Sequence, residues 1–546
     1  MPAIHATALG GSGLPRTGVQ GISPAVLDPA LALELGYSAI EEALRLKASF
    51  ADVRLEASLD EELTVSGGRY GGADLRSGRG LGVRVLVDGA WGYAAVDEPN
   101  RHDIAVTVKR AIELARAAAI LQERPVSLIG TEPQRGVFRT PIRRDPFEVP
   151  LEEKLALLEK LDGILGAPAK VCSTQATFRA GRVAKIYVSS DGAEVEQELV
   201  HVGAELSAVA MDGGERQRRS FPGGGALLVG RGWEAFEGSD LENRAAEVAE
   251  DAVALLTAPL CPEGSRTVIL GGAELARHLA LGLGPLFSLE RILGLGPEGG
   301  QGTFLVPTDL GNLSLASSIV NVTCDSRRRE GPSSQHFDDE GVETDAFDLL
   351  TEGRVTGFLS SRETAAQVGL EASQGNMRSA GWEASPRVAP ANLLLAPGQD
   401  GDLEALVADT KDGVLIDGPQ AFSQGPDGRT FFASSEMGWR IESGRRTARV
   451  KNPVHRGSVE TLWRSCDGIA DGADWSLFGL EADGAMPIGV GVAPARFNEL
   501  AIGSAPARLP RLGERDPLPI TGGPSHPAHR LTRPKASKRL PRRDVK

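Results

Sequence analysis

The chain of 546 residues is 41% apolar and 24% charged, which is the composition of a globular protein. Its 67 glycines follow no fixed period, so collagen-like and low-complexity classes are excluded. Because a single hydrophobic core stops growing at about 250–300 residues, the length predicts at least two domains. Glycine dispersed in this way indicates many tight turns between short strands.

The formal net charge of −14 argues against a protein that binds nucleic acid through its whole surface. The segment 511–546 is basic, with ten Lys and Arg against three Asp and Glu, and it has few apolar residues. Such a segment cannot form a core, and we expect a solvated, disordered tail. The alternative is a weak electrostatic contact of this tail with nucleic acid or an acidic partner. Specific recognition of nucleic acid is not expected.

The cysteines indicate neither a zinc ribbon nor a disulfide framework, because they lie far apart in the sequence. They are Cys172, Cys261, Cys324 and Cys466. The N-terminal sequence lacks the charged region and the apolar run of a secretory signal. No window approaches the roughly 18 consecutive apolar residues of a membrane span. We therefore expect a cytoplasmic protein that does not bind membranes.

The first half of the chain is predicted to form a mixed α/β domain. Apolar residues at helical spacing predict helices over 31–46, 100–121 and 151–165, and alternation of apolar and polar residues predicts strands. The predicted strands are 52–58, 62–66, the hairpin 82–89 with AWGYAAV, and the runs KVCSTQATFRA, RVAKIYVSSDG, EVEQELVHVGAELSAVAM and ERQRRSFPGG. Asp88-Gly89 is expected to form the hairpin turn.

The second half is predicted to differ. Ser239–Glu242 has the pattern of a capping box that opens a helix, and the strand 266–271 precedes an apolar helical stretch at 273–287. Short strands with Gly, Pro and Asp turns then indicate an antiparallel β domain. The predicted class is α+β with two domains. The predicted parts are a disordered N-terminus (1–30), an N-terminal α+β domain (31–235), a C-terminal β-rich domain (236–510) and the basic tail (511–546).

No self-sufficient active site is recognisable in the sequence. The glycine-rich segments do not lie between a strand and a helix with a phosphate-binding Lys, and no G-x-S-x-G is present. Of the eight histidines, only His278 lies on an apolar helix. A lone His in such a helix is more often a core residue than a ligand.

Several segments, taken in order, resemble the TldD/PmbA family, once called modulators of DNA gyrase and understood as peptidase subunits. The segment His336–Gly341 is similar to the family's D-D-E-G loop, and a G-N-x-R segment follows it. ANLLLAPG, GVLIDG, SEMGWRIESG and MPIGVG then occur in the family's order, and FADVRLEAS and GRGLGVRVLVDGAWGYAAV match in the N-terminal half. The resemblance covers roughly residues 35–505, and the colinear set is specific although each fragment alone is weak.

The resemblance implies one of two roles. Active family members carry a helical H-E-x-x-x-H and a downstream Cys, which hold zinc through two imidazoles and a thiolate, while the Glu is the general base. Partner subunits resemble the active ones in fold but lack the metal site, and the two kinds assemble together.

Aligned on this pattern, the helix after RTVILG has His278 at the first His, Leu279 at the Glu and Leu283 at the second His. The ligand Cys falls at about Phe478 or Gly479, and this part of the chain has no Cys. One imidazole does not hold Zn²⁺, and without the Glu no group takes the proton from the water. The resemblance therefore implies no catalytic residue, no metal ligand set and no cofactor for this chain.

Zinc is expected only if a partner subunit supplies it or if a site is rebuilt elsewhere, for which Cys324-Asp325 and the cluster around His336 offer polar groups. In the family, the acidic loop resembles a conformational or substrate-contacting element. The residues predicted to bind peptide are Asp338, Asp339, Glu340 and Gly341. The alternative is that these acids are merely solvated in a turn.

The leading hypothesis is a zinc-free, TldE-like, non-catalytic subunit of a peptidase complex that handles unfolded or small peptides. We expect a homo-oligomer or a hetero-oligomer with an H-E-x-x-x-H subunit. Its β domain would hold an extended peptide by backbone pairing at strand edges. Two alternatives remain open: an active metallopeptidase with altered ligands, and a standalone scaffold or binding protein that has lost proteolysis.

Overall fold

The computed structural model describes residues 27–122, 124–223, 227–296, 302–482 and 486–504. The predicted disordered N-terminus lies outside these ranges except for its last four residues, and Pro29 already begins the first helix. The predicted basic tail lies wholly outside them. The described residues belong to one compact unit and mix helices with strands, which confirms the α+β class.

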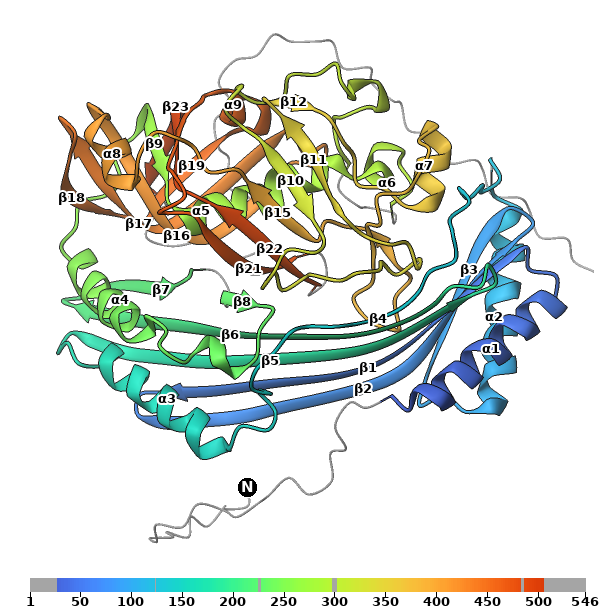
Figure 1. Ribbon diagram of the computed structural model, residues 1–546. Helices are drawn as coiled ribbons and strands as arrows, with labels where there is room; N and C mark the ends of the chain where they lie inside the picture. Colours follow the sequence, from blue (N-terminus) through green and yellow to red (C-terminus); the bar gives the residue numbers. More distant parts are fainter. Residues whose placement is uncertain (1–26, 123, 224–226, 297–301, 483–485, 505–546) are drawn as a thin grey trace, which may run out of the picture. The chain divides into compact units, whose positions relative to one another are not determined.

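The N-terminal half builds one long, curved sheet (Figure 1). Its strands are β1 (Phe50–Ser66), β2 (Arg69–Val87), β3 (Ala90–Asp97), β4 (Arg135–Arg139), β5 (Val171–Ser189), β6 (Glu194–Asp212), β7 (Glu215–Phe221) and β8 (Leu227–Val229). Their order is β3-β2-β1-β5-β6-β4, with β7 and β8 also paired to β6. The predicted hairpin is present between β2 and β3, with positive φ at Asp88 and Gly89.

Two strands of this sheet are longer than predicted. The segments 52–58 and 62–66 belong to the single 17-residue β1, and the first two runs after residue 170 belong to the 19-residue β5. The gaps predicted between these segments are therefore corrected. In β1 the chain stays extended across the predicted gap because it is paired with β2 on one side and β5 on the other. Asp60, in the middle of the predicted gap, still lies opposite Arg76 in β2 and Gly181 in β5.

Four helices pack on this sheet through apolar stripes: α1 (Pro29–Arg45), α2 (Arg101–Ala119), α3 (Leu151–Leu165) and α4 (Leu241–Leu255). One core joins α1 and α2 to the sheet, and a second core joins α3 and α4 to it. Asn100 caps α2 as predicted, because its side chain accepts two backbone N–H groups. The predicted capping box of α4 is corrected: Asp240 is the N-cap, and its side chain caps no N–H group.

The packing of α4 shows where the N-terminal sheet gives way to the C-terminal sheets. Leu241, Ala245 and Val248 of α4 are buried in the same core as α3 and the N-terminal sheet. The C-terminal sheets begin only with β9, at Gly264. The change of sheets thus lies between α4 and β9, because the apolar stripe of α4 packs on the N-terminal sheet. The domain boundary predicted at 235/236 stays a prediction.

The C-terminal half contains a six-stranded sheet in the order β12-β11-β10-β15-β22-β21 and a seven-stranded sheet in the order β16-β9-β23-β19-β17-β18, with β20 on β23. A separate two-stranded sheet is formed by β13 and β14. The bounds of all these strands are β9 (Gly264–Leu270), β10 (Val322–Asp325), β11 (Ala346–Thr351), β12 (Arg354–Val355), β13 (Met377–Arg378), β14 (Arg387–Val388), β15 (Asn392–Leu395), β16 (Asp412–Gln424), β17 (Thr430–Glu442), β18 (Arg445–Lys451), β19 (Pro453–Ser458), β20 (Cys466–Ile469), β21 (Ser476–Ala482), β22 (Met486–Val492) and β23 (Ala495–Ser504). The helices between them are α5 (Gly272–Arg277), α6 (Leu289–Ile292), α7 (Arg362–Val368), α8 (Leu403–Ala408) and α9 (Val459–Arg464).

These sheets are mixed rather than purely antiparallel. β9 pairs with β16 in parallel, and β15 pairs with β22 in parallel. Parallel partners need long crossover connections, and long stretches of chain separate both pairs. The other pairs of named strands in this half are antiparallel as predicted. The two parallel pairs were not predicted, because local alternation shows that a segment is a strand but not which distant strand it joins.

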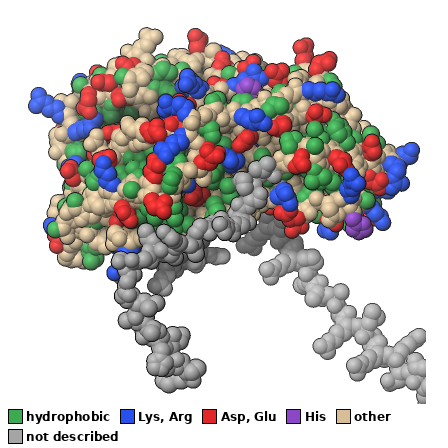
Figure 2. Space-filling view, turned by 60° about the horizontal axis from the view of Figure 1, so that its bottom comes forward, with side chains coloured by type: hydrophobic (Ala, Val, Ile, Leu, Met, Phe, Trp, Pro, Cys, Tyr) green, Lys and Arg blue, Asp and Glu red, His purple; other side chains and the backbone are tan. Residues whose placement is uncertain are grey.

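One large core spans both C-terminal sheets and the helix after β9. Among the described residues, no helix is long and apolar enough to cross a bilayer. On the face drawn in Figure 2, Lys and Arg side chains are interspersed with Asp and Glu. This mixed face offers no broad basic area for nucleic acid.

Candidate metal centre

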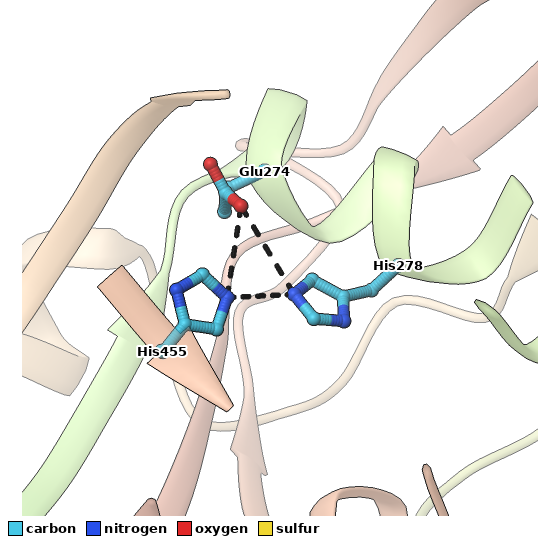
Figure 3. Close-up of side chains that lie close together, drawn as sticks. All are labelled: Glu274, His278 and His455. Carbon is cyan, nitrogen blue, oxygen red and sulfur yellow. Dashed lines mark hydrogen bonds and ion pairs between the residues drawn. The ribbon is translucent and has the colours of Figure 1, made fainter. Parts of the chain in front are cut away.

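A helix directly after β9 brings two polar side chains into the C-terminal core. α5 continues into a π-helical turn, η2 (His278–Leu283), and a 3-10 turn, η3 (Gly284–Phe287). Glu274 and His278 are four residues apart, so they lie on one face of this helix. His455 reaches them from β19 of the seven-stranded sheet, and the three side chains converge (Figure 3).

Each of the three side chains points one polar atom toward the other two: Nε2 of His278, Nε2 of His455 and Oε1 of Glu274. Nε2 of His278 lies 2.7 Å from Nε2 of His455. Oε1 of Glu274 lies 4.0 Å from the first nitrogen and 3.7 Å from the second. We call Glu274, His278 and His455 the Glu/His/His cluster; its geometry is compatible with a shared metal ion.

The cluster is enclosed: Glu274 and His455 are 0% exposed and His278 is 2% exposed. Burial raises the pKa of Glu274 to about 8 and lowers the pKa of His455 to about 3. Burial, together with His455 and Arg277, lowers the pKa of His278 well below its usual range. An apolar environment disfavours the charged form of every such group. Without a cation, a protonated carboxyl and two neutral imidazoles are therefore the stable forms at neutral pH.

The donor set of the cluster fits zinc, the metal that H-E-x-x-x-H and a downstream Cys hold in the active members described above. Two imidazoles and one carboxylate are a recurrent Zn²⁺ ligand set. Oε2 of Glu274 accepts a hydrogen bond from Ser435 at 2.8 Å. Oε1, which faces the imidazoles, is buried and has no hydrogen-bond partner among the described residues. A cation would satisfy this oxygen, and bound Zn²⁺ supplies Lewis acidity that can activate a water molecule.

Aromatic rings separate the cluster from the nearest cavity. Phe422 packs edge-on against His278 with ring centroids 5.2 Å apart, and Phe431 does so at 4.9 Å. Phe422 also lines a cavity of about 190 Å³. Arg378 and Met486 line both this cavity and a larger one of about 500 Å³, so the two adjoin. The ring of Phe422 thus stands between the cavities and His278.

The other predicted ligand positions lie outside the cluster. Leu279 and Leu283 are fully buried in the C-terminal core. The ring of Phe478 lies beside the start of α5, 2.9 Å from the point where a Cβ on Gly272 would be. His278 is the one predicted position that joins the cluster. The absence of bound metal stays a prediction.

The polar groups suggested for a rebuilt site do not gather. Cys324 lies on β10 and is fully buried, and the ring of His336 stacks on Phe138 with centroids 4.1 Å apart. Among the described residues, the group whose ligand atoms lie close enough to share a metal ion is the Glu/His/His cluster, and it includes neither Cys324 nor His336. The Glu/His/His cluster is therefore the candidate metal centre of this chain.

The acidic loop predicted to bind peptide is buried against the N-terminal sheet. Asp338 is 2% exposed, and its carboxylate accepts backbone N–H groups from its own loop and from Met377. Gly341 has a φ of 70°, and a Cβ there would lie 2.5 Å from a ring carbon of Tyr187. These two residues shape the loop and allow it to approach the sheet closely.

The other two acids of the loop form ion pairs with that sheet. Nζ of Lys185 lies 3.2 Å from Asp339, and Arg84 donates a hydrogen bond to Glu340 at 3.1 Å. Burial would raise the pKa of Asp339, but Lys185 and Arg54 lower it overall. The loop thus ties the two halves together. Peptide binding by its four residues stays a prediction, and in the structure their polar side chains have partners within the chain.

The larger cavity lies directly beside this loop. Lys185 and Ser379, which both donate hydrogen bonds to Asp339, line it together with Trp382. The acidic loop therefore supports the wall of the cavity. Charged residues of both signs face it, namely Glu56, Asp60, Glu61, Glu62, Asp74, Arg76 and Arg179.

Glu274 and His455 are the cluster residues that the sequence analysis missed. The spacing E-x-x-x-H joins Glu274 to His278 and could have revealed the first of them. When H-E-x-x-x-H is aligned on this spacing, Ala273 stands at the first His, Glu274 at the Glu and His278 at the second His. His455 has no local signal, because its place depends on the pairing of β19 with β17 and β23.

Comparison with known proteins identifies related sequences along most of the chain. Models described as PmbA/TldA metallopeptidase domain 1, central domain and C-terminal domain match residues 51–119, 144–256 and 267–504. A metalloprotease of Methanothermobacter thermautotrophicus is 28% identical over 84% of this chain and 96% of its own length. A metalloprotease TldD homologue of Haemophilus influenzae is 26% identical over 83% of this chain and 92% of its own length.

Solved structures share the fold. TldE from Thermococcus kodakarensis superposes with a TM-score of 0.67 at 19% identity, over 85% of this chain and 99% of its own. A protein of Thermotoga maritima described as a candidate modulator of a DNA gyrase superposes with a TM-score of 0.68 at 18% identity, over 86% of this chain and 100% of its own. The resemblance found in the sequence is confirmed, and the chain belongs to the PmbA/TldD family.

Proposed function

We propose that this chain is a subunit of a TldD/TldE-type peptidase assembly that does not hydrolyse peptides itself. In this proposal a family member with an intact H-E-x-x-x-H supplies the catalytic centre. This chain contributes the fold and part of the peptide-binding surface.

The observation that carries the proposal is the enclosure of the polar groups on the helix after β9. A catalytic metal needs a coordination position that both water and the substrate can reach. Here Glu274 and His278 are buried, and Phe422 lies between His278 and the adjoining cavity. The neighbouring positions Leu279 and Leu283 are apolar and belong to the core. A peptide bond has no access to any of these groups in this arrangement.

The cavity of about 500 Å³ is the place where we expect an extended peptide to lie. It is large enough for a few residues, and its mixed charges suit peptides of varied sequence. Trp382 offers an aromatic surface, and Ser379 and Lys185 connect the wall to Asp339. In this proposal the acidic loop positions the wall that contacts the peptide.

The proposal is tested by adding this chain to a family member from the same genome that carries H-E-x-x-x-H. We expect the two chains to co-purify and cleavage of an unstructured peptide to exceed that by the partner alone. The variant Trp382→Ala should lower peptide cleavage by the complex without preventing co-purification. Absence of any association and of any change in the partner's activity would contradict the proposal.

An active metallopeptidase with altered ligands is the second candidate function. It is favoured by the Glu/His/His cluster itself, which has a donor set suited to zinc. Phe422 lines the smaller cavity and packs on His278, so a movement of this ring would open that cavity toward His278. This candidate predicts chelator-sensitive peptide cleavage by the isolated chain, which the first candidate does not.

A further inference from the structure

We propose that Glu274, His278 and His455 bind one divalent transition-metal ion, Zn²⁺ by its donor set, in a closed structural site that ties the helix after β9 to strand β19. This inference does not depend on the proposed function. A structural ion is compatible both with a non-catalytic subunit and with an active metallopeptidase.

The distances favour a shared ion over a simple hydrogen-bonded cluster. A hydrogen bond between the two imidazoles explains the 2.7 Å between His278 and His455. It does not explain why Oε1 of Glu274 turns toward both rings and stays unpaired, 4.0 and 3.7 Å away. A single ion bound by Oε1 of Glu274 and by Nε2 of both histidines would satisfy all three groups at once. A buried carboxylate oxygen without a partner needs a physical cause, and an ion shared with the two imidazoles supplies one.

The site differs from the one that the family motifs describe. No thiolate takes part, and the carboxylate of Glu274 is a ligand instead of a general base. In the register with Glu274 at the Glu position, Ala273 stands at the first His and cannot coordinate. The segment expected to carry the ligand Cys lies at the start of α5, where Phe478 packs beside Gly272. His455 comes from a different strand, β19, and replaces the missing ligands.

The surroundings give the ion a structural role. Glu274 and His278 belong to the helix, whereas His455 belongs to the seven-stranded sheet, so the ion would cross-link two elements of one core. Phe422 and Phe431 pack on His278 and exclude solvent. A catalytic site keeps an exchangeable position open to substrate, whereas this cluster is enclosed. Because the ligands meet only in the folded chain, metal binding would stabilise the fold.

The test uses the full chain, purified and then equilibrated with Zn²⁺ before free metal is removed. Elemental analysis for zinc, iron, nickel, copper and manganese measures the ions per chain, and we expect one zinc. X-ray absorption at the zinc edge should show nitrogen and oxygen neighbours, imidazole scattering and no sulfur. Removal of the metal with a chelator should lower the melting temperature, and added Zn²⁺ should restore it.

Variants locate the site. His455→Gln and Glu274→Gln should each lose zinc down to background, with folding checked by circular dichroism. His201→Gln, at a histidine of the N-terminal sheet, is the matched control and should keep one zinc. A chain that folds but binds no zinc after equilibration overturns the proposal. So does zinc retained by folded His455→Gln, or a zinc edge that shows sulfur neighbours. The chelator experiment needs no variant, so misfolding of one variant does not prevent the test.

Discussion

His278 and His455 are separated by 177 positions in the sequence, yet their Nε2 atoms face each other at 2.7 Å inside the C-terminal core. Nothing about either residue's immediate neighbours in sequence shows this contact. It arises because β9, which leads into the helix of His278, lies in the same sheet as β19, the strand of His455. The Glu/His/His cluster therefore exists only through the tertiary packing of the helix after β9 against this sheet.

Replacement of Phe422 by Ala is predicted to expose His278. The Phe422 ring covers His278 on one side and lines a cavity on the other, so its removal joins the cavity to the cluster. With metal removed by a chelator, diethyl pyrocarbonate should modify His278 in Phe422→Ala much faster than in the parent chain, as measured by mass spectrometry. Phe422→Leu keeps most of the volume and should stay protected. Equal protection in both variants would mean that Phe422 is not the barrier.

Loss of Arg84 is predicted to destabilise the contact between the two halves. Its guanidinium pairs with Asp52 at 2.6 Å and with Glu340 at 3.1 Å, and all three side chains are buried. Arg84→Ala leaves two buried carboxylates without their cation, which should cost about 3–5 kcal/mol in free energy of unfolding. Arg76→Ala removes an ion pair in which both side chains are more than half exposed and should change stability by about 0.5 kcal/mol or less. Denaturant titration measures the free energy of unfolding of both variants. Similar small losses in the two would contradict a stabilising role of the buried Arg84 ion pairs.

The loop glycine Gly341 is predicted to tolerate no side chain. Its φ is 70°, and a Cβ would lie 2.5 Å from Tyr187, so Gly341→Ala adds a steric clash to backbone strain. We expect a loss of about 2–4 kcal/mol in free energy of unfolding. Gly213 also has a positive φ but has nothing within 4 Å of its Cβ position, so Gly213→Ala should cost only about 1 kcal/mol. Equal losses in the two variants would show that contact with Tyr187 is unimportant.

His201 is predicted to make stability depend on pH. Burial lowers the pKa of His201 to about 4, below the value near 6.5 of an unfolded chain. Between these values the unfolded state binds the extra proton, so the free energy of unfolding falls as the pH falls from about 6.5 to 4. His201→Asn removes this contribution, and its stability should fall less over the same range. Parallel pH curves for the two chains, measured by denaturant titration, would contradict this.

Much of the fold could be predicted from the sequence. Apolar spacing located α2 and α3 within one or two residues of their observed ends, and it located the helical stretch after β9. The sequence could not show that β1 and β5 are continuous, or that β9 and β16 are parallel. These features depend on pairing with strands distant in the sequence, which leaves no local pattern.

The candidate site could be predicted only in part. His278 was identifiable as a histidine on an apolar helix. Because the motif H-E-x-x-x-H was aligned with His278 as its first His, the E-x-x-x-H spacing from Glu274 to His278 was overlooked. His455 lies in KNPVHRG, a segment without any metal-binding pattern. Burial of the acidic loop was also hidden, because Asp338 and Glu340 are polar residues whose partners lie elsewhere in the chain. Polar residues that are buried through tertiary partners look the same in sequence as solvated ones.

The decisive measurement is peptide cleavage by the isolated chain, equilibrated with Zn²⁺ and assayed with an unstructured fluorogenic peptide. For a non-catalytic subunit we expect no cleavage above that by Glu274→Gln, and cleavage only when a subunit with H-E-x-x-x-H is added. Cleavage by the chain alone that a chelator abolishes and that Glu274→Gln lacks would contradict the account and establish a metallopeptidase with altered ligands.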